Sequence, residues 1–110
     1  MKILFAALAI ASALFGNAYA QANKPTVVLV HGAFADSSSW NGVVKILEKD
    51  GYSVVAVANP LRGVKSDAGY VADILGSIKS PVVLVGHSYG GSVISDAAEG
   101  HTNVKALVYV

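Results

Sequence analysis

Cysteine is absent from this sequence of 110 residues, which excludes disulfide bonds and thiolate metal sites. A surplus of charge of one sign is also lacking, since 8 Lys and Arg residues stand against 7 Asp and Glu residues. Such a balance implies no nucleic-acid partner and no anionic membrane partner. We therefore look for function in specific motifs, and we expect no metal and no other cofactor.

A long apolar run occurs only at the start of the chain. Ile3 to Phe15 form a mostly apolar run of 13 residues, which is too short to span a bilayer, where about 20 are needed. Lys2 precedes it, and Ala18-Tyr19-Ala20 places small residues at positions −3 and −1 of a cleavage site before Gln21. We predict a signal peptide over residues 1–20 and a secreted or periplasmic mature segment over residues 21–110, with no membrane attachment. Cleavage removes Lys2 and leaves seven basic and seven acidic residues.

Continuous apolar segments in the mature part predict a buried parallel sheet. Such runs suit strands that are covered on both faces. Amphipathic helical spacings fall between them, so the order is strand, helix, strand, helix, strand, helix, strand. The strands are expected at Val27–Val30, Ser53–Val57, Val82–Val85 and Ala106–Val110. The first helix is expected at about 40–50, with N-caps among Ser37–Ser39 and a stop at Gly51. The second is expected to begin after Ser66-Asp67 and end before Pro81, and the third to run over Tyr89–Glu99.

The predicted fold class is α/β, with a doubly wound, mostly parallel sheet in a three-layer αβα arrangement. In such a sheet the first and third strands become neighbours at the switch point, where ligands bind. The chain ends within its last apolar run, at Val110. We therefore expect residues 21–110 to be the amino-terminal part of one larger domain.

The segment Gly86-His87-Ser88-Tyr89-Gly90 fits G-x-S-x-G, the nucleophile elbow. A chain of this composition would contain such a match by chance about one time in ten, so its context matters. Here the match follows a predicted strand and opens a predicted helix. Side chains at Gly86 or Gly90 would collide with the backbone of so tight a turn. We predict that Ser88 is a nucleophile; the alternative is an ordinary helix N-cap serine.

The loop after the first strand, His31-Gly32-Ala33-Phe34, is the second candidate element. Acyl transfer needs two N–H donors directed at the oxygen on which negative charge develops. The Tyr89 amide is one candidate, because it lies at a helix N-terminus. The second donor is expected from Ala33, or failing that from Phe34, because Gly32 lets the loop turn back over the strand end.

No histidine in the sequence is placed as the general base. We expect a buried structural role for His87, a hydrogen-bonded packing role for His31, and a solvent-facing position for His101. The hydrolase order along the chain is Ser, then Asp or Glu, then His, so both remaining members of a triad are expected beyond Val110. The acidic residues weighed for that role all lie at or within predicted helices: Asp36, Asp67, Asp73 and Asp96.

These motifs resemble the α/β-hydrolase superfamily, in particular the branch of small esterases, plant methyl-ester hydrolases and hydroxynitrile lyases. The likeness covers Thr26 to Val110, as the third to sixth strands of that family's sheet. It implies Ser88 as nucleophile and the Ala33 and Tyr89 amides as oxyanion donors. It places Arg62 in a loop near the site, with no role assigned. The likeness rests on Val28–Phe34, Trp40, Asn59-Pro60 and Gly86–Gly91.

We therefore expect a serine hydrolase that acts on small-molecule carboxylic esters through an acyl-enzyme on Ser88. Two alternatives keep the fold: a lyase or haloperoxidase-like enzyme, and a catalytically incompetent fragment. Nucleotide binding is disfavoured, because Ser88 occupies the position of the second glycine in G-x-G-x-x-G, and no Gly-Lys-Ser/Thr is present.

Overall fold

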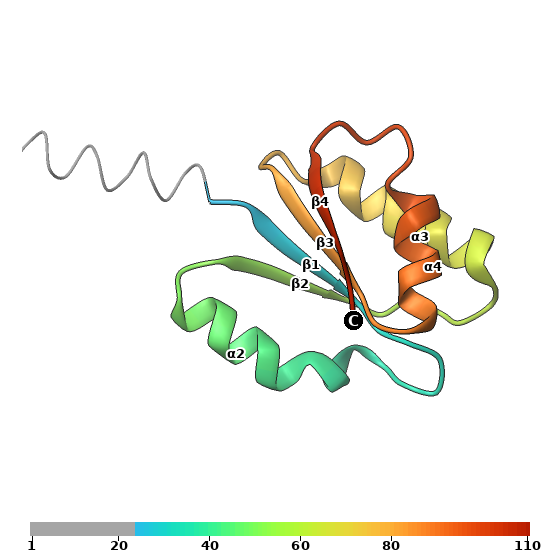
Figure 1. Cartoon of the computed structure of the whole chain (residues 1–110), viewed down its shortest axis with the longest axis horizontal. Helices are drawn as coiled ribbons and strands as arrows, with labels where there is room; N and C mark the ends of the chain where they lie inside the picture. Colours follow the sequence, from blue (N-terminus) through green and yellow to red (C-terminus); the bar gives the residue numbers. More distant parts are fainter. Residues whose placement is uncertain (1–23) are drawn as a thin grey trace, which may run out of the picture.

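The computed structural model describes residues 24–110, so the predicted signal peptide lies outside the described residues. Within this range four strands alternate with helices (Figure 1). In chain order the elements are β1 (Thr26–Val30), the 3₁₀ helix η1 (Ser37–Trp40), α2 (Asn41–Lys49), β2 (Ser53–Val57), α3 (Val64–Ser77), β3 (Val82–Gly86), α4 (Tyr89–Ala97) and β4 (Val104–Tyr109).

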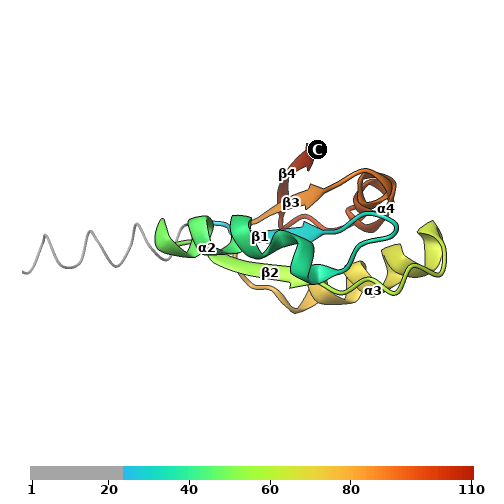
Figure 2. The same cartoon turned by 90° about the horizontal axis from the view of Figure 1, so that it is seen from below.

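The four strands form one sheet in the order β2-β1-β3-β4, and every neighbouring pair is parallel. The first and third strands along the chain are neighbours, as predicted, with Val30 opposite Gly86. Helix α2 lies on one side of the sheet and helices α3 and α4 lie on the other (Figure 1). Figure 2 views the sheet from the α2 side. The α/β class and the three-layer arrangement are therefore confirmed for this part of the fold.

Strand β1 is buried along its whole length because helices cover both of its faces. Successive side chains of a strand point to opposite faces. Val28 and Val30 pack among α3 and α4 residues, whereas Val27 and Leu29 pack with Trp40 on the α2 side. This double burial explains why the sequence shows an unbroken apolar run instead of alternation.

Two helix starts differ from the sequence prediction. Asp36, and not a residue of Ser37–Ser39, caps the first helical segment: it has extended backbone and its carboxylate accepts the Ser38 N–H at 2.9 Å. Helix α3 begins at Val64, four residues earlier than expected, after Gly63 with a φ of 135°. Asp67 therefore lies inside the first turns of α3 and is free to bond to groups outside the helix.

Across residues 24–110 we find no helix that combines the length and apolar character needed to cross a bilayer.

Candidate active site

Ser88 connects β3 to α4 in a backbone conformation that few non-glycine residues adopt. Its φ is 52° and its ψ is −119°. Such strain costs of order 1–3 kcal/mol and persists only where the surroundings enforce it. Ser88 occupies the N-cap position of α4, but its side chain is exposed and makes no capping hydrogen bond, unlike an ordinary N-cap serine.

Two glycines create the space for this turn. A Cβ on Gly86 would lie 2.5 Å from the carbonyl oxygen of Gly90, and a Cβ on Gly90 would lie 2.5 Å from that of Val30. Real Cβ atoms are not found so close to backbone oxygens, because the contact is strongly repulsive. The prediction that side chains at Gly86 and Gly90 would collide with the backbone is therefore confirmed. Without a side chain at Gly90, α4 can start in contact with the end of β1.

The elbow is bonded to the strands on both sides. The His87 N–H donates to the Val30 carbonyl at 3.0 Å, and the Ser88 N–H donates to the Val110 carbonyl at 3.0 Å. The Tyr89 N–H, at the first position of α4, has no intrahelical acceptor. The helix dipole adds partial positive charge at this point. The local geometry is that of a tight turn in which an exposed hydroxyl is followed by an amide without an intrahelical acceptor.

The loop after β1 lies against this turn, as predicted from the topology. A Cβ on Gly32 would lie 3.1 Å from the His87 carbonyl oxygen and 3.4 Å from the Ser88 Cβ. Ala33 follows directly and is exposed. Phe34, the second choice for an oxyanion donor, has a φ of 62° and a fully exposed side chain. The two predicted donor loops are thus brought together, and an apolar ring projects beside them.

The end of β2 reaches the same edge of the sheet. Leu61 follows β2, has a φ of 61°, and leaves 39% of its side chain exposed. Its N–H and that of Arg62 both donate to the Asp67 carboxylate at 3.1 Å. The Tyr89 hydroxyl donates to the same carboxylate at 2.9 Å. Asp67 therefore joins the loop after β2 to the residue that follows Ser88.

The three histidines fall in different surroundings. His31 is 2% exposed and its Nδ1 lies 2.8 Å from the Gly32 carbonyl oxygen, which confirms a hydrogen-bonded packing role. His87 is exposed, contrary to the prediction, and its ring stands nearly perpendicular to that of Trp40, with 6.4 Å between the ring centroids. His101 is half-buried on the loop between α4 and β4, not fully solvent-facing as expected.

The acidic residues in this range do not complete a triad. Asp67 is held by other donors, and Asp36 is occupied by Ser38, whose side-chain and backbone hydrogen bonds lower the pKa of the Asp36 carboxyl. No group of three potential metal ligands occurs within residues 24–110.

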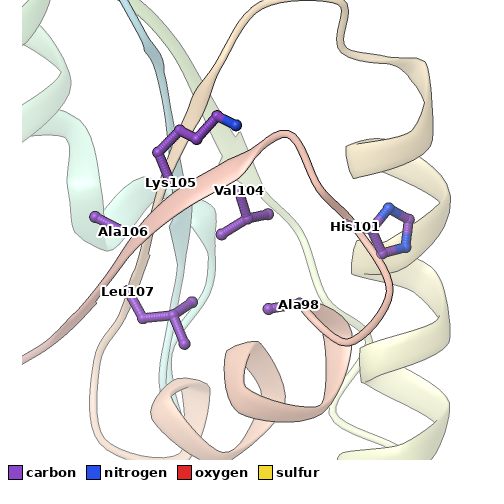
Figure 3. Close-up of a pocket in the computed structure, with 6 residues that line it drawn as sticks. All are labelled: Ala98, His101, Val104, Lys105, Ala106 and Leu107. Atoms are coloured by element: carbon purple, nitrogen blue, oxygen red, sulfur yellow. The ribbon is translucent and has the colours of Figure 1, made fainter.

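A hollow of about 350 Å³ lies between the end of α4 and β4 (Figure 3). Ala98, His101 and Leu107 are among its lining residues. It is bordered by the loop that precedes β4, whereas Ser88 precedes α4, so this hollow is not the elbow site.

The hydrogen bonds of Asp67 were missed by sequence reasoning, which took Ser66-Asp67 as a helix start and weighed Asp67 only as a triad acid. Tyr89 is 22 residues away, and no local spacing links the two. The available signal was Asn59-Pro60 shortly after a strand, because the Asn59 side-chain amide also donates to Asp67, at 3.4 Å.

Comparison with known proteins agrees with this geometry. The model of the alpha/beta hydrolase family matches residues 27–110. The pyrethroid hydrolase of Sphingobium wenxiniae is 35% identical over 98 residues, covering 76% of this chain and 34% of that protein. The carbendazim hydrolyzing esterase of a Nocardioides species is 31% identical over 96 residues, covering 76% of this chain and 40% of that protein.

Among solved structures, an extracellular alpha/beta-hydrolase from a Paenibacillus species superposes with a TM-score of 0.70 at 27% identity. The match covers 77% of this chain and 39% of that one. The chain thus spans between a third and two-fifths of the length of these relatives. Because the family model matches most of the chain, this protein belongs to the alpha/beta hydrolase family.

Proposed function

We propose that the full-length protein containing this chain is a serine hydrolase of carboxylic esters, with Ser88 as its nucleophile. The observation that carries the proposal is the backbone of Ser88, at φ 52° and ψ −119°, with an exposed side chain that caps no helix. Strain of this kind in a tight strand-to-helix turn is the arrangement that exposes a serine Oγ to substrate. The hydrolase and esterase names of the relatives support the same chemistry.

In this mechanism the Ser88 Oγ adds to the ester carbonyl carbon. The hydroxyl proton passes to a histidine outside the described residues and from there to the leaving alcohol. The Tyr89 amide, together with that of Ala33 or Phe34, stabilises the oxyanion of the tetrahedral intermediate, an effect of about 3 kcal/mol per donor. Water then hydrolyses the acyl-enzyme and releases the acid.

An apolar substrate fits the surroundings of the site. Phe34 and Leu61 follow neighbouring strands, and both expose apolar side chains at the carboxyl edge of the sheet. Ligands bind at this edge in open α/β sheets. We propose that these two side chains contact the hydrocarbon part of the ester.

A fluorophosphonate probe on the full-length protein tests the nucleophile. We expect stoichiometric labelling and p-nitrophenyl ester hydrolysis, both abolished in Ser88→Ala and retained in Ser92→Ala. Ser92 is the matched control because it is an exposed serine in α4, the helix that Ser88 precedes. Labelling that persists in Ser88→Ala would contradict the proposal, and cyanohydrin cleavage without ester hydrolysis would favour the lyase alternative.

We also propose that the protein is exported to the periplasm or the medium. The basis is sequence alone, namely Lys2, the apolar run after it and the Ala18-Tyr19-Ala20 cleavage pattern. Mass spectrometry of the protein from its native host is expected to find Gln21 as the first residue. A protein that retains Met1 and stays in the cytoplasm would argue against export.

A further inference from the structure

Asp67 is a fully buried carboxylate that plays no part in the chemistry proposed above. Its exposed fraction is 0%. Charged carboxylates are rarely buried to this degree unless they have strong partners. The donors are neutral groups from two segments, the start of α4 and the loop after β2: the Tyr89 hydroxyl at 2.9 Å, the Leu61 and Arg62 N–H groups at 3.1 Å, and the Asn59 side-chain amide at 3.4 Å.

These contacts fix the protonation of both partners in the Asp67–Tyr89 pair. Burial alone raises the pKa of the Asp67 carboxyl, but the Arg62, Tyr89, Asn59 and Leu61 donors together outweigh it and lower that pKa below its ordinary value. Burial, the hydrogen bond to Asp67 and the charge of Asp67 raise the pKa of the Tyr89 hydroxyl. At neutral pH the carboxylate is charged and the phenol keeps its proton, so the direction of the bond is set.

Asp67 is hydrogen-bonded to two segments that reach the carboxyl edge of the sheet, where Ser88 lies. Tyr89 is bonded to Ser88 and carries the amide proposed to face the oxyanion. Leu61 carries one of the two apolar side chains beside the site, and its left-handed φ of 61° is unfavourable for a residue of its size. A conformation of this kind is retained where a contact such as the 3.1 Å bond to Asp67 fixes the N–H.

We propose that Asp67 is a positioning residue of the hydrolase site, holding Tyr89 at the start of α4 and Leu61 at the end of β2 in their working geometry. The inference rests on the proposed role of Ser88. Asp67 does not touch the reacting atoms. It acts on the Tyr89 amide, which is proposed to face the oxyanion, through the Tyr89 side chain. It acts on Leu61, which is proposed to contact the substrate, through the loop after β2.

A positioning role and a purely structural role predict different kinetics. Loss of a structural contact lowers the folded fraction but leaves the kcat of each folded site unchanged. Displacement of a transition-state donor lowers kcat itself, with little change in KM. A misplacement of about 1 Å at a donor reduces rate by as much as about a hundredfold.

The decisive experiment uses Asp67→Asn in the full-length protein, with Asp73→Asn as matched control. Asp73 is an exposed carboxylate on the same helix. Active sites are counted by fluorophosphonate labelling, and kcat is expressed per labelled site. We expect kcat of Asp67→Asn to fall about tenfold or more through the displaced Tyr89 amide, any rise in KM to report the displaced Leu61 side chain, and Asp73→Asn to match wild type.

Tyr89→Phe removes the hydroxyl and keeps the ring, so it tests the same contact if Asp67→Asn fails to fold. We expect a severalfold lower kcat, and a double variant no slower than Asp67→Asn alone, because both changes break one link. A folded Asp67→Asn with the kcat of Asp73→Asn, or a Tyr89→Phe with wild-type kcat, overturns the inference. Hydrolysis that survives Ser88→Ala would instead overturn the proposed function, so the two failures are distinguishable.

Discussion

Gly90 packs directly on the carbonyl of Val30: a Cβ at this glycine would lie 2.5 Å from the Val30 oxygen. The same carbonyl accepts the His87 N–H at 3.0 Å. The end of β1 and the beginning of α4 are therefore in backbone contact, and this contact places the turn of Ser88 at the edge of the sheet.

Gly90→Ala is expected to destabilise the full-length protein by about 2 to 3 kcal/mol, because α4 must move away from β1 to admit the methyl group. Gly69→Ala is the matched control, since nothing lies within 4 Å of a Cβ at that position in α3. The control should gain up to about 1 kcal/mol from helix propensity. Urea unfolding measures both, and equal stabilities of the two variants would contradict the packing argument.

Gly32→Ala tests the contact between the two donor loops. Its Cβ would lie 3.1 Å from the His87 carbonyl oxygen and 3.2 Å from His87 Nδ1, so the loops must separate by a few tenths of an ångström. We expect kcat for ester hydrolysis to fall about tenfold, because the Ala33 amide moves relative to Ser88. Gly42→Ala in α2 has open space and should keep wild-type kcat. Wild-type turnover in Gly32→Ala would show that this contact does not set the site.

Trp40 anchors the α2 side of the sheet. It is 8% exposed, packs with Val27 and Leu29, and meets the ring of His87 edge to face. Trp40→Ala should cost about 3 to 5 kcal/mol, as expected for a buried aromatic side chain. Ile46→Ala, at a side chain 63% exposed on α2, should cost far less. Thermal unfolding distinguishes the two; similar losses would mean that Trp40 contributes little packing.

The sequence predicted the strands and their order well because the signals are local or topological. An unbroken Val27–Val30 run is itself the mark of a strand covered on both faces. The neighbouring position of β1 and β3 follows from the doubly wound arrangement, and it brings Gly32 against Ser88. The roles of Gly86 and Gly90 could be predicted because a tight turn excludes side chains whatever the rest of the chain does.

Other features depend on contacts between distant residues, and the sequence could not supply them. The Tyr89 hydroxyl, on α4, donates to Asp67, on α3. Only the packing of the two helices in the folded protein brings this pair together. His87 was expected to be buried but is exposed, because burial at a turn depends on which distant segments pack around it and not on the local residue pattern. Asp36, and not one of the serines that follow it, is the helix cap. Asp and Ser are both favoured N-caps, so the residue pattern alone does not choose among these adjacent candidates.

Acid stability provides a separate test of Asp67. The pKa of the Asp67 carboxyl is lower in the folded protein than its ordinary value of about 3.9. A carboxyl with a lowered folded pKa stabilises the fold above its unfolded pKa, and this contribution is lost as pH falls through the folded pKa. Asp67→Asn cannot titrate, so its own contribution to stability does not change over this range.

We therefore expect Asp67→Asn to be less stable than wild type by about 2 to 3 kcal/mol near neutral pH, since buried donors lose a charged acceptor. The gap should stay constant down to about pH 5 and narrow below about pH 4, where Asp67 of the unfolded wild-type chain begins to take up a proton while that of the folded protein still resists protonation. Urea unfolding of wild type, Asp67→Asn and the exposed-site control Asp73→Asn across this range measures it. The stability difference between wild type and Asp67→Asn could instead stay unchanged at about pH 3, or widen as pH falls. Either result would mean that Tyr89 and the loop after β2 do not hold the Asp67 carboxyl in its charged form, because a protonated acid would then serve these donors equally well.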